Sequence, residues 1–254
     1  MLAVVLLNSV EVFALNSGEV VNTNIKYRLE FSKTDRMVFI GHLDLLKFFQ
    51  RTFKRAGIPI GHSWGFNPHQ LTTFAVPLAL GVSSVGEILD IQLTEKMDCD
   101  VIKDTLNNNL PEGIDILQVV ELEFSAENCA AAVDYADYCV TLDDKYDNIN
   151  EVVNEVLSAE EINIERTVKK KTKIVNIRPF IKSIVVDNDG DKTEIYANIA
   201  TGSQGNLKID VLLDYIYKKM GVEFRFEKVD ILRGTLYTDH KGELLPLCLE
   251  EEFM

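Results

Sequence analysis

The spacing of hydrophobic and polar residues changes several times along the chain between the period of a strand and that of a helix. Residues 26–31 alternate polar and apolar side chains, which is typical of a half-buried strand. Over residues 42–55 the apolar side chains fall on one helical stripe and the basic ones on another, and Gly57 follows as a candidate C-cap. The pattern therefore predicts a strand followed by an amphipathic helix.

The next stretch continues this alternation as far as residue 124. We expect strands over residues 71–80, 87–93 and 114–124 and a helix over residues 98–110. The resulting order, βαββαβ, is that of a split βαβ or ferredoxin-like domain, an antiparallel sheet with two helices on one face.

The C-terminal half shows a similar pattern with added strands. Its expected strands are residues 138–142, 162–168, 174–177, 181–186, 194–200 and 224–237, and its expected helices are residues 148–157 and 207–220. We therefore predict an α+β fold made of tandem ferredoxin-like domains with antiparallel sheets. The predicted boundaries are residues 25–124 and 135–254, separated by an alanine-rich linker over residues 125–134.

Residues 1–24 are expected to be an N-terminal extension outside these domains. Their apolar run is interrupted by Asn8, Ser9 and Glu11 and has no basic residue before it, so it fits neither a secretory signal nor a membrane span. The four cysteines are far apart, and none forms a CxxC pair. We therefore expect reduced thiols, no metal, no cofactor, no membrane association and a cytoplasmic location.

Charge is distributed unevenly along the chain. The net charge of −14 argues against general affinity for nucleic acid. Yet residues 26–80 carry eight basic and only three acidic side chains, and residues 166–182 carry seven basic and no acidic ones. Aromatic residues lie close to the first basic stretch, and together these features predict a site for RNA or another anion. The candidate contacts are Lys47, Arg51, Lys54, Arg55, Trp64, Phe66, Asn67, His69, Lys169, Lys170, Lys171 and Arg178.

Three of the four histidines lie within residues 42–69. His42 and His69 could act as general acid and base, because histidine titrates near neutral pH. Their spacing does not match a helical HxxxH metal motif. A structural role is the competing interpretation, since His42 lies on the apolar stripe of the expected helix.

Several short motifs occur in a fixed order: FSKTDRMVFIGHLDL at residues 31–45, RAGIP at 55–59, GFNPH at 65–69 and EILD at 87–90. Together they resemble the bacterial radical-SAM-linked proteins, a family without defined biochemistry, and looser similarity extends to residue 237. Gln70 stands where the family pattern has proline. The resemblance implies an accessory protein that works with a cobalamin-binding radical SAM protein, and it supplies no catalytic residues.

Three functions follow from these observations. The first is a non-catalytic accessory protein that binds RNA or another anionic substrate. The second is a metal-independent endoribonuclease that uses His42 and His69. The third is a protein–protein adaptor that does not bind nucleic acid.

Overall fold

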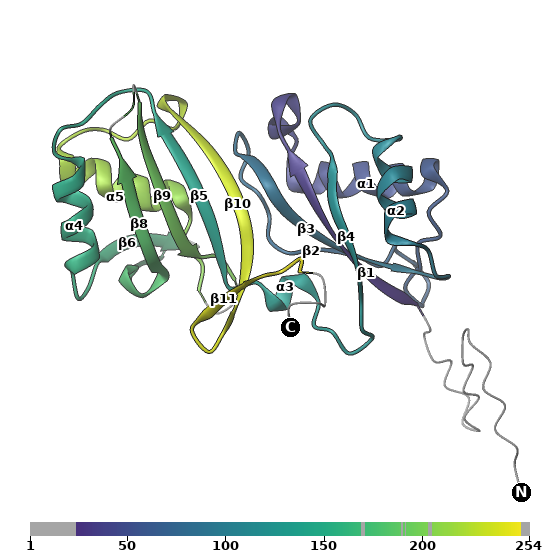
Figure 1. The fold of residues 1–254 in the computed structure, drawn as a ribbon. Helices are drawn as coiled ribbons and strands as arrows, with labels where there is room; N and C mark the ends of the chain where they lie inside the picture. The colour runs from purple at the N-terminus through teal and green to yellow at the C-terminus, as the bar shows by residue number, and fades with distance from the viewer. Residues whose placement is uncertain (1–23, 169–170, 189, 191, 203–204, 250–254) are drawn as a thin grey trace, which may run out of the picture.

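The structure, a computed structural model, describes residues 24–168, 171–188, 190, 192–202 and 205–249 (Figure 1). The expected extension, apart from Asn24, lies outside the described residues. So do Lys169 and Lys170 of the second basic stretch.

The N-terminal half has the predicted order of strands and helices. Its elements are β1 (Ile25–Lys33), η1 (Asp35–Phe39), α1 (His42–Ala56), β2 (Thr72–Phe74), β3 (Ser83–Leu93), α2 (Cys99–Asn107) and β4 (Ile116–Leu122). The strands are antiparallel in the order β4-β1-β3-β2, which is the ferredoxin-like order. Alternate residues of β1, Tyr27, Leu29 and Phe31, are fully buried in a core that includes Phe49 of α1 and Ile102 of α2.

The C-terminal half repeats this arrangement and adds a hairpin. Its elements are α3 (Cys129–Ala132), β5 (Tyr135–Leu142), α4 (Ile149–Ser158), β6 (Asn163–Val168), β7 (Lys171–Asn176), η2 (Arg178–Phe180), β8 (Ile181–Asp187), β9 (Thr193–Ala200), α5 (Ile209–Met220), η3 (Phe226–Lys228), β10 (Val229–His240) and β11 (Glu243–Pro246). The order β10-β5-β9-β8 is again ferredoxin-like, and the hairpin β6–β7 forms a separate two-stranded sheet. The predicted tandem ferredoxin-like α+β fold is therefore confirmed.

The two halves meet along one edge of β3. Short β2 pairs with β3 only at Leu89, Asp90 and Ile91, and at the other end of the same edge β10 pairs with Ser83 and Ser84 in parallel. This parallel contact joins both sheets into a single nine-stranded sheet. In Figure 1, β10 and β3 are the adjoining strands of the two halves. The hydrophobic pattern predicted the two sheets but not their junction, because parallel pairing over two residues leaves no periodic pattern in the sequence.

The close approach of the two halves depends on glycine. A Cβ atom at Gly86 of β3 would lie 2.4 Å from the carbonyl oxygen of Gly234 on β10. Only glycine lets the two backbones approach this closely without displacement.

Four segments differ from the sequence prediction. The strand expected over residues 224–237 begins only at Val229, because η3 occupies the residues just before it. The strand expected over residues 71–80 is limited to β2, since the chain turns away before Pro77 and continues to Gly81, which has a φ of 84°. The expected linker contains α3, whose Cys129 is fully buried and donates its backbone N–H to Asp90. Strand β11, which pairs with the end of β10, was not predicted. The domain boundaries themselves stay a prediction.

No helix in the described part of the chain is long and apolar enough to cross a membrane.

Candidate functional site

Helix α1 holds the first group of predicted contacts on its solvent side. Its buried stripe, which includes Phe49 and Phe53, packs on the sheet, and Gly57 ends it in the left-handed conformation with a φ of 71°. Lys47, Arg51 and Lys54 follow one another at helical spacing, and all three are exposed. The helix therefore presents positive charge to solvent.

The turn over residues 61–70 carries the second group. Its two sides are joined by pairing of His62 with Gln70, and Ser63 donates its backbone N–H to the His69 carbonyl at 2.8 Å. Trp64 is 75% exposed and Phe66 is fully exposed at the tip of this turn. Together they give the turn an exposed apolar patch, the kind of surface that interaction sites use.

The turn is attached to the helix. Gln70 donates its side-chain amide to the Gln50 carbonyl of α1 at 3.4 Å. Gln50 lies three residues after Lys47 and four before Lys54, so the base of the turn lies beside the basic face. Asn67 is also exposed in the turn. We call these eight residues the basic-aromatic surface: Lys47, Arg51, Lys54, Arg55, Trp64, Phe66, Asn67 and His69.

Arg55 has a structural contact as well as an exposed position. Its guanidinium donates to the Asn109 carbonyl, beyond the end of α2, and to the Thr52 hydroxyl at 3.3 Å. Arg55 therefore helps to hold α1 against the segment after α2.

The two histidines considered as acid and base have different neighbours. The half-buried His42 ring lies edge-on to Phe74, with ring centroids 5.3 Å apart. The exposed His69 shares a hydrogen bond between its Nδ1 atom and the Ser63 hydroxyl at 2.7 Å. No contact joins the two imidazoles in the described structure.

The second basic stretch is only partly described. Arg166 and Lys173 are exposed and face each other across the hairpin β6–β7, and Lys171 begins β7. Arg178 is half-buried, and it donates to the carbonyls of Ile181 at 3.0 Å and of Leu157, in the last turn of α4, at 2.8 Å. The donors of Arg178 thus stabilise the chain around α4.

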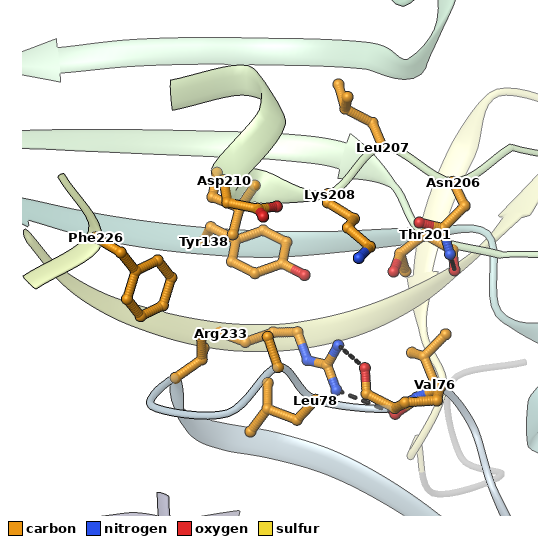
Figure 2. Close-up of a pocket in the computed structure, with 14 residues that line it drawn as sticks. Val76, Leu78, Tyr138, Thr201, Asn206, Leu207, Lys208, Asp210, Phe226 and Arg233 are labelled. Carbon is orange, nitrogen blue, oxygen red and sulfur yellow. Dashed lines mark hydrogen bonds between the residues drawn. The ribbon is translucent and has the colours of Figure 1, made fainter. Parts of the chain in front are cut away.

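A pocket of about 210 Å³ lies at the junction of the two halves (Figure 2). One wall comes from the segment between β2 and β3, and the others come from the start of α5, from η3 and from strands β5 and β10. Its lining residues include Val76, Leu78, Tyr138, Thr201, Asn206, Lys208, Asp210, Phe226 and Arg233. None of these was a predicted site residue, because they converge only through the pairing of β3 with β10. The weak sequence similarity around Asn206 and Arg233 was the one available indication.

A buried ion pair forms one side of the pocket. The Arg233 guanidinium donates to both Glu87 carboxylate oxygens, at 2.7 and 2.8 Å, and the two side chains are 2% and 3% exposed. It also donates to the carbonyls of Val76 and Pro77 at 3.2 and 3.5 Å (Figure 2). Burial by itself would lower the pKa of Arg233, but Glu87, followed by Tyr138, raises it above its usual value. Arg233 therefore stays charged.

The opposite rim of the pocket has polar groups with few contacts. Lys208 and Asp210 have no ion-pair or hydrogen-bond partner for their side chains among the described residues, and Asn206 donates to the Thr201 carbonyl at 3.4 Å. Lys208 is also the N-cap of α5, and no side chain caps that helix. The first backbone amides of α5 consequently border the pocket.

The described residues contain no group of three histidine, cysteine or acidic side chains arranged to hold a metal ion. A family model described as "Uncharacterized protein conserved in bacteria (DUF2344)" matches residues 26–209. The chain belongs to this family. The match includes both α1 and the turn, so the basic-aromatic surface lies within the DUF2344 region.

No curated protein matches the chain. Among solved structures, it is similar to one described as "Crystal Structure of a Cbf5-Nop10-Gar1 Complex", with a TM-score of 0.45 and 12% identity over 85% of this chain and 50% of that one. This DUF2344 protein thus spans half the length of that chain. A second, "Crystal Structure of an Unknown Protein from Galdieria sulphuraria", has a TM-score of 0.24 and 14% identity over 83% of this chain and 97% of the other.

Proposed function

We propose that the protein is a non-catalytic accessory protein that binds single-stranded RNA through the basic-aromatic surface. The observation that carries this proposal is the attachment of an exposed aromatic turn to the basic face of α1, through Gln70 and Gln50. Lys47, Arg51 and Lys54 have no ion-pair partner among the described residues, so their charges are available to phosphates. Trp64 and Phe66 supply faces on which bases can stack.

The negative charge of the whole chain restricts RNA binding to contacts at this surface. The net charge of −14 repels a polyanion, but this repulsion is largely screened at distances beyond the Debye length, which is about 8 Å at physiological salt. Binding then depends on contacts at the surface itself. It is expected to weaken with salt, with a slope of roughly 0.7 for each phosphate contact to a single strand.

The partner in this proposal is a cobalamin-binding radical SAM protein in the cytoplasm. Support comes from the motifs at residues 31–45 and 65–69, which resemble those of radical-SAM-linked proteins. All four cysteines are free thiols, as suits a reducing compartment. In this role the protein would present an RNA to the partner enzyme.

The test is retention of RNA by tagged protein isolated from its native lysate at low and then moderate salt. The variant Arg51→Glu/Lys54→Glu reverses two charges on α1. Its matched control, Lys218→Glu/Lys219→Glu, makes the same change in net charge on the last turn of α5. We expect the wild type and the control to retain RNA and the α1 variant to lose it.

Three results would contradict the proposal. Equal loss of RNA from both variants would show that net charge, and not α1, governs retention. Protein free of nucleic acid in every sample, together with salt-resistant capture of the radical SAM protein, would indicate the adaptor. Cleavage of bound RNA that depends on both His42 and His69 would instead indicate an endoribonuclease.

A further inference from the structure

The pocket between the two halves has the dimensions of a small ring system. Its volume is about 210 Å³. This is smaller than the range of about 300–1,000 Å³ that is usual for drug-sized ligands. A single nucleotide base fits such a space better than a peptide or an oligonucleotide.

One side of the pocket is apolar. The Phe226 ring of η3 and the Leu78 side chain, which precedes β3, both line this side (Figure 2). The ring lies against Gly81, since a Cβ atom there would be 3.3 Å from Phe226 Cε1. A flat aromatic ligand can pack between the phenyl ring and the aliphatic side chains.

The polar rim has both donors and acceptors. The Lys208 ammonium and the first amides of α5 are donors, whereas the Asp210 carboxylate accepts. Asp210 makes the rim a poor site for phosphate alone, because it places a negative charge beside the two kinds of donor. It suits a ligand that has an amino or imino group to donate as well as a phosphate.

The Arg233 guanidinium lines the pocket but adds no net charge to it. Its positive charge is balanced by Glu87, and it also holds the segment that contains Val76. Arg233 therefore keeps that wall in place. The free positive group at the pocket is Lys208, which has no ion-pair partner in the described structure.

From these features we infer that the pocket binds one nucleotide, with its base between Phe226 and the aliphatic wall and its phosphate near Lys208 and the start of α5. The nucleotide can be an unpaired residue of RNA or a free monophosphate. The RNA source rests on the proposed function above.

The pocket and the basic-aromatic surface are connected through the segment before β3. The Gly81 amide donates to the Val38 carbonyl in η1 at 3.0 Å, and Phe74, shortly before Val76, contacts His42 at the start of α1. These contacts join the wall of the pocket to η1 and to the first turn of α1.

The experiment measures binding of the full chain to the four ribonucleoside 5′-monophosphates, to ribose 5-phosphate, to inorganic phosphate and to decamers of single-stranded RNA. Calorimetry gives each affinity. The variants are Phe226→Leu, which removes the ring but keeps an apolar side chain, and Lys208→Gln. The control, Lys219→Gln, makes the same change at the other end of α5, and melting temperatures show that each variant is folded.

We expect at least one nucleoside monophosphate to bind more tightly than ribose 5-phosphate and inorganic phosphate. Phe226→Leu should weaken it by about fivefold or more, the effect of losing one stacked base. Lys208→Gln should also weaken it, whereas Lys219→Gln should not. The same two variants should weaken the RNA decamer that contains the preferred base.

The arms separate the two proposals. In one outcome, no monophosphate binds, and RNA binding is lost in Arg51→Glu/Lys54→Glu but unchanged in Phe226→Leu and Lys208→Gln. That outcome overturns the pocket assignment and supports the RNA-binding function. A bound monophosphate without RNA binding supports the pocket with a free nucleotide as its ligand and overturns the RNA function. Equal affinity for ribose 5-phosphate and the monophosphates overturns the base-binding assignment, and absence of all binding overturns both.

Discussion

Arg233 on β10 binds both carboxylate oxygens of Glu87 on β3, at 2.7 and 2.8 Å, and so joins the two halves of the protein through a nearly inaccessible ion pair. The pair also orders the pocket, because Arg233 donates to the Val76 and Pro77 carbonyls. A single group thus links the junction of the sheets with the wall of the candidate site.

Removing one partner of this pair should be strongly destabilising. Arg233→Met leaves the Glu87 carboxylate buried without its counter-ion, so we expect the free energy of unfolding to fall by about 3–5 kcal/mol. Denaturation with urea, followed by circular dichroism, measures the change. Lys96→Met, which breaks the exposed Lys96–Glu121 pair, is the control and should change stability little. A similarly small change in the free energy of unfolding of both variants would show that the buried Arg233 pair contributes no more to stability than an exposed pair.

The close backbone contact at Gly86 gives a second test of the junction. Gly86→Ala would place a methyl group 2.4 Å from the Gly234 carbonyl oxygen, so β3 and β10 would have to separate. We expect a loss of about 1–3 kcal/mol, typical of an overpacked site. Gly190→Ala is the matched control, since an added Cβ at Gly190 would meet only the Lys192 carbonyl oxygen, at an ordinary 3.8 Å, and Gly190 is not among the glycines with a positive φ. Equal stabilities of the two variants would contradict the close contact.

Glu30 predicts a dependence of stability on pH. Burial raises the pKa of the Glu30 carboxyl above its ordinary value of 4.5 in the folded protein. Between that value and the raised one, the folded state holds more protons than the unfolded state. The contribution of Glu30 to stability is therefore present below the unfolded pKa and is lost as pH rises through the folded pKa.

The variant Glu30→Gln removes this titration. We expect its stability relative to the wild type to increase as the pH rises from about 4 to 7, in unfolding curves measured at several pH values. Glu95→Gln, an exposed acidic position, is the control and should follow the wild type. A pH-independent difference for Glu30→Gln would contradict the buried position of this carboxyl.

Trp64 reports directly on the basic-aromatic surface, because it is the one tryptophan of the chain and is 75% exposed. We expect the free protein to show strong quenching by acrylamide, and single-stranded RNA to reduce that quenching as bases cover the indole. The Arg51→Glu/Lys54→Glu variant should keep the quenching of the free protein but lose the effect of RNA. An RNA that binds without changing the quenching would place the binding site away from the turn.

Local sequence patterns correctly predicted those features that depend on neighbouring residues alone. The apolar stripe of α1 and its end at Gly57 could be read from periodicity and from the need for a left-handed residue. The two ferredoxin-like strand orders followed from the succession of elements. Charge and aromatic residues likewise identified Arg51 and Trp64 as exposed candidates.

Features that depend on distant residues could not be predicted in this way. Glu87 alternates like an ordinary strand residue, and nothing near it in the sequence shows that it pairs with Arg233. The pocket shares this property, since Val76, Tyr138 and Asp210 come from three separate parts of the chain. Arg178 was predicted to contact RNA because it lies in a basic stretch. In the structure it donates to the carbonyls of Leu157 and Ile181, which no local pattern indicates.

The division of one edge of β3 between β2 and β10 has a consequence for biosynthesis. The N-terminal half emerges from the ribosome long before β10, so the edge at Ser83 and Ser84 stays without its partner until residues 229–240 have been translated. Unpaired strand edges are templates for incorrect association between nascent chains. Pairing of β10 with β3 thus removes the unpaired edge at which nascent chains could associate.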